Sequence, residues 1–177
     1  MPSFTKKAIV ESFLHLAGKK PLEKITVRDI VDDCGINRNT FYYYFQDIYA
    51  VLEDLCHELV RALPTEQTLA VTLASFYRAF LDFSSRHPHA AKNLSLSLGF
   101  EGLERYFTTD LDGVIADCYV RDAKAMPPAL GMRILRHAVL GLCLDALRAE
   151  KEHRGDAAAI EQLLALQPYP FLNTDKT

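Results

Sequence analysis

Apolar residues recur every three or four positions along most of the chain, and this spacing predicts amphipathic helices. No convincing β-hairpin signal interrupts them, so the predicted fold class is all-α. Short runs that contain glycine, proline or several polar residues separate the helices. The predicted helices cover residues 6–18, 27–34, 38–46, 48–62, 66–86, 100–124, 129–151 and 157–166, and residues 90–99 are ambiguous between a short helix and a turn.

The helical pattern changes near Pro64. Before this residue the predicted helices are short and the turns between them are tight. After it the helices are long and rich in leucine, alanine and phenylalanine. We therefore predict a small N-terminal region of about 60 residues before a larger helical one. Within this division we assign residues 1–47 to a three-helix N-terminal domain and residues 48–177 to the larger helical domain.

The predicted helix 27–34 carries start and stop signals at its two ends. Thr26 can cap the first turn with its hydroxyl, and Asp29 can return a hydrogen bond to the capping residue. Ile25 and Ile30 fit a hydrophobic staple around the same start. Gly35 fits the left-handed residue that ends many helices, so both boundaries are predicted.

The next predicted helix has two different faces, and Asn37 can cap its start. Phe41 and Phe45 are four residues apart and point to one side, which predicts that both are buried. The first turn and the opposite side carry polar groups: Arg38, Asn39, Thr40, Tyr42, Tyr43 and Gln46.

A helix, a short glycine-containing turn and a second helix form the arrangement in which the second helix enters the major groove of DNA. Tyrosine and threonine hydroxyls suit phosphate oxygens, while arginine can pair with guanine and asparagine with adenine. The same outward tyrosines would also suit a protein partner. The pattern alone therefore leaves open a DNA-binding protein and a helical protein-interaction module or co-activator.

The stretch "KKAIVESFLHLAGKKPLEKITVRDIVDDCGINRNTFYYYFQDIYAVLEDL" resembles the N-terminal helix-turn-helix domain of TetR-family (TetR/AcrR-type) transcriptional regulators. The resemblance rests on the run from "TV" to "CGIN" and on the aromatic "TFYYYF". It implies a dimeric repressor that binds an inverted-repeat operator on double-stranded DNA and is released by a small-molecule effector. By position it implies DNA contacts from Thr26, Arg28, Arg38, Asn39, Thr40, Tyr42 and Tyr43.

Within that set, the resemblance implies that Thr40 and Tyr42 mainly contact phosphates, whereas Arg38, Asn39 and Tyr43 lie nearest the bases. The chain departs from the family at three positions. Asn39 stands where a small residue is frequent, and Gln46 and Ile48 stand where lysine is common. Residues 1–60 contain seven basic and nine acidic side chains, a net charge of -2. We therefore predict few cationic phosphate contacts.

Beyond Pro64 the resemblance concerns architecture, and it implies an effector pocket and a dimer interface in the helical domain. The aromatic candidates for the pocket are Phe76, Tyr77, Phe80, Phe83, Phe100, Tyr106 and Phe107. The candidates for the dimer interface are Leu135, Ala138, Val139, Gly141, Leu142 and Ala146. For both sets the alternative is that the side chains fill the core of their own subunit.

Composition and motifs argue against other classes of protein. Twenty basic residues stand against 23 acidic ones, for a net charge of -3, and no apolar run has the length of a membrane span. Four cysteines without a C-x-x-C pair indicate reduced thiols and a cytoplasmic protein. No catalytic motif is found, so we expect neither an enzyme nor a cofactor. His87 and His89 flank Pro88 in what we interpret as a turn rather than a metal site.

Overall fold

The computed structural model describes residues 4–64, 67–121 and 129–148, together with the single positions 158 and 162. Within these residues the chain is entirely helical and contains seven α-helices and one 3-10 turn. This confirms the predicted all-α fold class. The predicted helix 157–166 lies almost wholly outside the described residues.

The described helices follow the predicted order closely. Helix α2 begins and ends where the sequence signals place it, and Gly35 is left-handed with φ 69°. The bounds of all elements are α1 Phe4–Ala17, η1 Leu22–Lys24, α2 Val27–Cys34, α3 Arg38–Tyr44, α4 Ile48–Arg61, α5 Leu69–Arg86, α6 Pro88–Arg121 and α7 Ala129–Arg148.

Helix α6 is much longer than the helix expected there, because the ambiguous stretch is also helical as far as residue 98. Its backbone is interrupted at Gly99, where φ is 60° and ψ is -165°. An L-residue with a side chain rarely adopts this conformation, so glycine permits the bend. Gly99 therefore divides α6 into a short first part and a longer second part.

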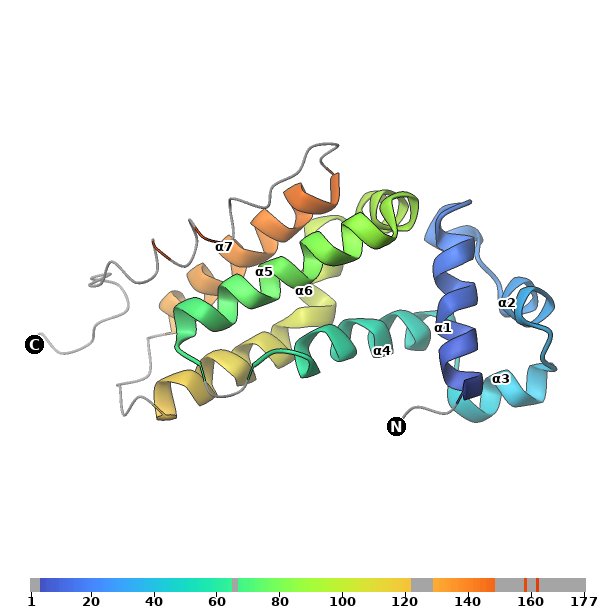
Figure 1. The fold of residues 1–177 in the computed structure, drawn as a ribbon, viewed down its shortest axis with the longest axis horizontal. Helices are drawn as coiled ribbons and strands as arrows, with labels where there is room; N and C mark the ends of the chain where they lie inside the picture. Colours follow the sequence, from blue (N-terminus) through green and yellow to red (C-terminus); the bar gives the residue numbers. More distant parts are fainter. Residues whose placement is uncertain (1–3, 65–66, 122–128, 149–157, 159–161, 163–177) are drawn as a thin grey trace, which may run out of the picture.

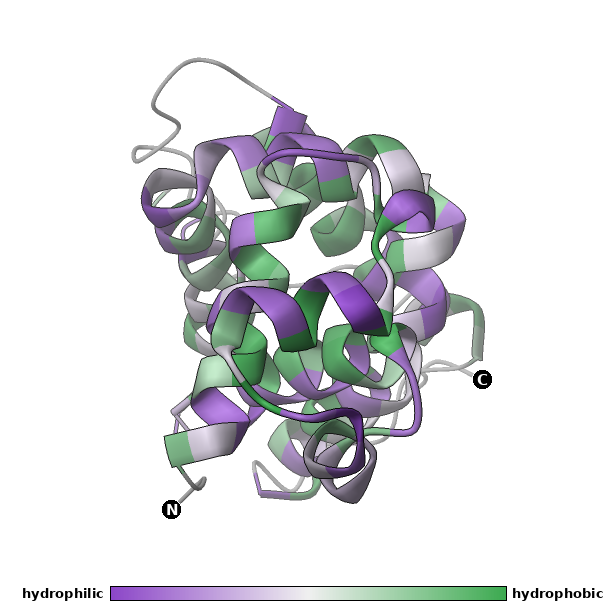
Figure 2. Ribbon diagram, turned by 90° about the vertical axis from the view of Figure 1, so that its right-hand side faces the viewer, coloured by the Kyte–Doolittle hydropathy of each residue, from purple (hydrophilic) through white to green (hydrophobic). Residues whose placement is uncertain are grey.

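The helices form two regions that α4 connects (Figure 1). Helices α1, α2 and α3 gather at one end, while α5, α6 and α7 pack lengthwise against one another at the other end. Each helix carries both hydrophobic and hydrophilic residues, as amphipathic helices do (Figure 2). The apolar faces join in one core that runs through both regions.

Hydrogen bonds tie the first part of α6 to the N-terminal region. Asn93 Nδ2 donates to the carbonyl oxygen of Ala17 over 2.8 Å, and the backbone N–H of Leu22 donates to Ser97 Oγ over 3.2 Å. Farther along α6, Asp110 pairs with His57 of α4. The orientation of the small region therefore depends on residues distant in the sequence.

No helix among the described residues has the length and apolar character needed to cross a membrane. The four cysteines are free thiols, and Cys56, Cys118 and Cys143 are buried. Burial raises the pKa of Cys143 well above its usual value, so this thiol stays protonated.

Candidate nucleic-acid interface

The start of α2 is fixed by the reciprocal hydrogen bonds that the sequence predicts. Thr26 Oγ1 accepts from the backbone N–H of Asp29 over 3.2 Å, and Asp29 Oδ2 accepts from the backbone N–H of Thr26 over 2.8 Å. Lys20 adds an ion pair to Asp29 at 2.8 Å. The hydrogen bond from Lys20, followed by those from Thr26, lowers the pKa of Asp29 to about 2. The carboxylate that closes the cap is therefore ionised at neutral pH.

Helix α3 is held by its apolar side and by a cap. Asn37 Oδ1 accepts from the backbone N–H of Thr40 over 2.8 Å. Phe41 is fully buried, Phe45 is nearly so, and their ring centroids lie 6.1 Å apart. Two buried rings four residues apart set which side of this short helix faces outward.

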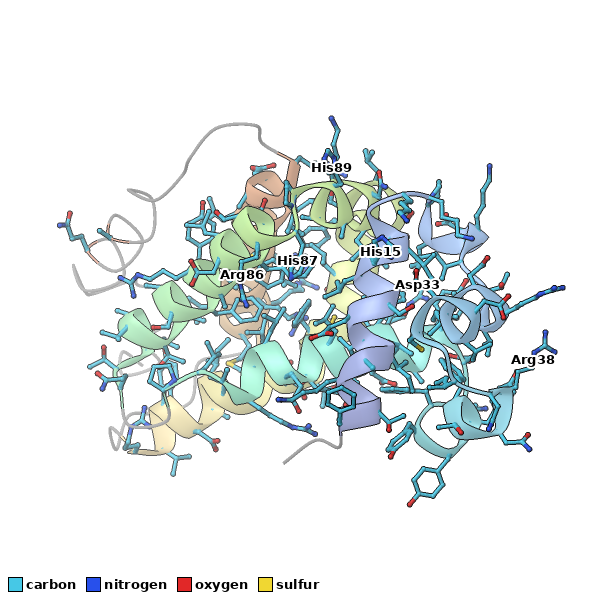
Figure 3. All side chains as sticks on the ribbon, turned by 45° about the vertical axis from the view of Figure 1, so that its right-hand side comes forward. His15, Asp33, Arg38, Arg86, His87 and His89 are labelled. Carbon is cyan, nitrogen blue, oxygen red and sulfur yellow. The ribbon has the colours of Figure 1, made fainter. Side chains whose placement is uncertain are left out.

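The outer side of α3 carries four of the side chains that the family resemblance implies as DNA contacts. Arg38 and Asn39 are exposed, and the tyrosines Tyr42 and Tyr43 are 55% and 81% exposed. Arg38 extends from the start of α3 away from the rest of the molecule (Figure 3). Tyr43 packs edge-on against Tyr44 with centroids 4.9 Å apart, which restricts its orientation.

Two of the predicted contact residues already use their hydroxyl protons within the domain. Thr26 Oγ1 donates to Asp29 Oδ2 over 2.6 Å, and Thr40 Oγ1 donates to Asn37 Oδ1 over 3.0 Å. A phosphate oxygen needs a donor, so either hydroxyl would have to exchange its present partner to contact one. Arg28 Nε lies 3.5 Å from Asp32 in an exposed pair, which holds the guanidinium only weakly.

The two positions that depart from the family pattern have different environments. Gln46 is exposed beside α3, whereas Ile48 is only 8% exposed and belongs to the core. Lys6 pairs with Asp54 at 2.6 Å and lies 5.7 Å from the ring of Phe45. Ile48 is therefore a packing residue, and the charge of Lys6 is partly balanced within the protein.

The aromatic candidates for an effector pocket pack mainly on one another. The ring centroids of Phe76, Phe80 and Phe107 lie 5.0–5.3 Å apart, and Tyr77 and Phe83 are buried beside them. Phe100 and Tyr106 are partly buried against the same core. These side chains form the interior of the helical region.

The dimer candidates on α7 divide between two faces of the helix. Leu135, Val139 and Ala146 are buried in the core of the single chain. Ala138 and Leu142 are exposed, and Gly141 is partly exposed with open space around its α-carbon. Sequence spacing missed two exposed apolar neighbours of Ala138 on the same face, Leu130 and Ile134.

The "RHPH" segment forms the corner between α5 and α6, as the turn interpretation expects. His87 ends α5, and Pro88 begins α6. Among the described residues, no group of three or more potential ligands could hold a metal ion. Sequence reasoning missed the pair between His15 and Asp33, whose side-chain atoms approach to 2.9 Å although 18 positions separate them.

Comparison with known proteins supports the helix-turn-helix interpretation. Residues 9–55 match the model of "Bacterial regulatory proteins, tetR family". An uncharacterized HTH-type transcriptional regulator of Bacillus subtilis, YxbF, is 24% identical over 63 residues, and the match spans 36% of this chain and 17% of that relative.

Solved structures of regulators share the fold along nearly the whole chain. The dihydroxyacetone kinase operon activator DhaS superposes with a TM-score of 0.64 at 17% identity, over 92% of this chain and 94% of that one. The fatty acid degradation regulator FadR from Bacillus halodurans gives 0.63 at 15% identity, over 93% and 96%. A TetR transcriptional regulator from Streptococcus agalactiae gives 0.58 at 23% identity, over 90% and 92%.

Proposed function

Because this chain belongs to the TetR family of bacterial regulatory proteins, we propose that it is a homodimeric repressor which a small-molecule effector releases from an inverted-repeat operator. The family and the structural neighbours are transcriptional regulators, so the chain is a regulator rather than an enzyme. DNA binding is the part of this proposal on which the rest depends.

The outer side of α3 is the observation that carries the proposal. Phe41 and Phe45 bury the inner side, so Arg38, Asn39 and Tyr43 project from a helix that is already fixed in place. In helix-turn-helix proteins the N-terminal residues of such a helix reach the base edges. Arg38 can pair with guanine through two N–H groups, and Asn39 can pair with adenine.

A dimer is proposed because one short recognition helix contacts too few base pairs to select an operator. The exposed side of α7 supplies a surface for a second copy, since Leu130, Ile134 and Leu142 leave apolar area in water. Ala138 and Gly141 lie on this side and would let a partner helix approach closely. Two copies joined there would present two recognition helices to successive turns of the DNA.

The rival function is a protein-interaction module or co-activator that uses the tyrosines of α3 for a protein partner. DhaS, which shares the fold, is an operon activator, so the direction of regulation has to be measured separately from DNA binding. The proposed direction is repression, and the effector is a small molecule.

The deciding experiment selects bound sequences from random double-stranded DNA and then measures affinity by fluorescence anisotropy. We expect enrichment of an inverted repeat with half-sites about 10 base pairs apart, or slightly more. Repression follows if the operator, placed before a reporter gene, lowers expression when the protein is present. Failure to enrich any sequence, with a folded dimer, would favour the protein-interaction alternative.

A further inference from the structure

A groove separates the end of α1 from the corner between α5 and α6, and its volume is about 480 Å³. One wall comes from the N-terminal region and the other from the helical region. The charged and titratable side chains that line it are Glu11, His15, Lys19, Arg86, His87 and His89. Figure 3 shows the three imidazoles and Arg86 around this junction, on the opposite side of α1 from Arg38.

The two cations of this groove, Lys19 and Arg86, form no ion pair with a carboxylate among the described residues. In the part of the chain that the structure describes, Arg86 uses only Nε, which donates to the carbonyl oxygen of Asp82 over 3.3 Å. Glu11 is the single carboxylate in the lining, and Asp33, which lies outside it, pairs with His15 and also interacts electrostatically with Lys19. A protein with a net charge of -3 therefore gathers Lys19, Arg86 and three imidazoles in one groove.

We propose that this groove binds a small phosphorylated molecule and that the bound anion changes the affinity of the protein for DNA. A guanidinium can hold phosphate through two parallel N–H bonds, and a lysine ammonium adds a compact charge. Imidazole N–H groups supply further donors. The volume lies in the range of small-molecule sites, and the groove is open to solvent, so a charged ligand can contact the cations while it keeps part of its hydration.

The position of the groove gives the anion a way to act on DNA binding. His15 lies on α1 and Lys19 just after its end, whereas Arg86, His87 and His89 lie at the α5–α6 corner. Beside the groove, the Asn93–Ala17 hydrogen bond joins the same two regions. An anion held by both walls would favour one orientation of the small region, and a ligand that prefers one of two arrangements shifts the equilibrium toward it. This part of the inference rests on the proposed DNA-binding function.

The first test measures anion binding without DNA. The full chain is titrated with inorganic pyrophosphate in a buffer free of phosphate and divalent metals, and the imidazole resonances are followed by NMR. We expect saturable shifts of the His87 and His89 signals with a Kd below about 1 mM, a modest affinity consistent with an open charged groove. Sodium chloride at equal ionic strength should leave them unshifted.

Matched variants assign the site. The double variant Lys19→Gln, Arg86→Gln should weaken pyrophosphate binding about tenfold or more, because each removed charge takes away charge-assisted hydrogen bonds. Arg105→Gln removes an exposed cation of α6 outside the groove and should leave the Kd unchanged. Two results would overturn the proposal. One is a pyrophosphate Kd that is the same in the double variant and the wild type, and the other is wild-type NMR shifts that never saturate.

The second test adds the selected operator and compares DNA affinity with and without saturating pyrophosphate at constant ionic strength. The expected result is a change of about fivefold or more, the lower end of ordinary coupling between sites, that disappears in the double variant. If pyrophosphate leaves the DNA affinity unchanged, the proposed coupling is wrong and only the proposed anion site remains. If the double variant instead loses DNA affinity without pyrophosphate, and pyrophosphate never saturates the wild-type chain, the groove contacts DNA phosphate and the proposal is wrong.

Discussion

Replacing Gln46 by lysine tests whether the chain binds DNA with few cationic contacts. Gln46 is exposed beside α3, at one of the two positions where the resemblance to the TetR family leads us to expect lysine. Each neutralised phosphate contributes about 0.9 to the slope of log affinity against log salt, so two subunits should steepen the slope by about 1.8. Between about 50 and 200 mM salt, this slope makes the variant lose about tenfold more affinity than the wild type.

The assay is fluorescence anisotropy with a labelled operator at several sodium chloride concentrations. Gln46→Met keeps a long neutral side chain and should leave the slope unchanged. Glu101→Gln makes the same change in net charge on α6, far from α3, and should also leave it unchanged. If the wild-type slope is already steep and Gln46→Lys does not alter it, the phosphate contacts come from other cations and the reasoning fails.

Ile48→Lys provides the contrasting case, although lysine is also common at that position in the family. Ile48 is only 8% exposed, and burial of such a side chain contributes about 1.5–3 kcal/mol. Lysine there loses this contribution and must also carry its ammonium out to water. We expect a lower melting temperature for Ile48→Lys and an unchanged one for Gln46→Lys. Equal melting curves would show that Ile48 is not a packing residue.

The remaining predictions concern the dimer, base recognition and the cap of α2. Among the described residues, no atom outside the adjacent turn of α7 lies within 4 Å of a Cβ added at Gly141, so Gly141→Arg should leave the subunit folded by circular dichroism while producing monomers in light scattering and abolishing operator binding. A dimeric variant would exclude this surface. Asn39→Ala should relax sequence preference at one base position in a repeated selection, whereas Tyr42→Phe should cost about 1 kcal/mol per subunit without altering preference. Uniform weakening by Asn39→Ala would mean that Asn39 does not contact a base. Because the pKa of Asp29 falls from 3.8 unfolded to about 2 folded, its contribution to stability is present above pH 3.8 and is lost as pH falls toward 2. The free energy of unfolding of Asp29→Asn should not show this loss between pH 3.8 and about 2. If the variant and the wild type have the same profile of unfolding free energy against pH, the prediction is wrong.

Local chemistry made the N-terminal half of the fold predictable from sequence. Thr26, Asp29 and Gly35 define both ends of α2 because a cap, its reciprocal carboxylate and a left-handed glycine act within a few residues. The buried and exposed sides of α3 follow from the spacing of Phe41 and Phe45 in the same way. Predicting which side of α3 faces outward therefore needed no tertiary information beyond the burial of two rings.

Features that depend on distant residues were not predictable. The sequence "RHPHAAKN" contains break signals, yet α6 begins at Pro88 and continues through them, because Ala90, Ala91 and Leu94 pack into the core. Helix α7 is apolar on two sides, so periodicity could not separate the buried Leu135 from the exposed Leu142. The groove beside α1 joins side chains from positions 11 to 89, and only the fold brings them together.

The bend at Gly99 matters for building hybrid regulators, in which the helix-turn-helix region of one protein replaces that of another. The part of α6 before the bend holds α1 and η1 through Asn93 and Ser97, whereas the part after it bonds to α4 through Asp110. A graft of residues 1–47 alone would leave the carbonyl of Ala17 and the N–H of Leu22 facing a foreign surface. The segment to transfer from this protein is therefore discontinuous, because it comprises the N-terminal helices together with residues 88–98. Gly99 is the position at which the two parts of α6 can be separated.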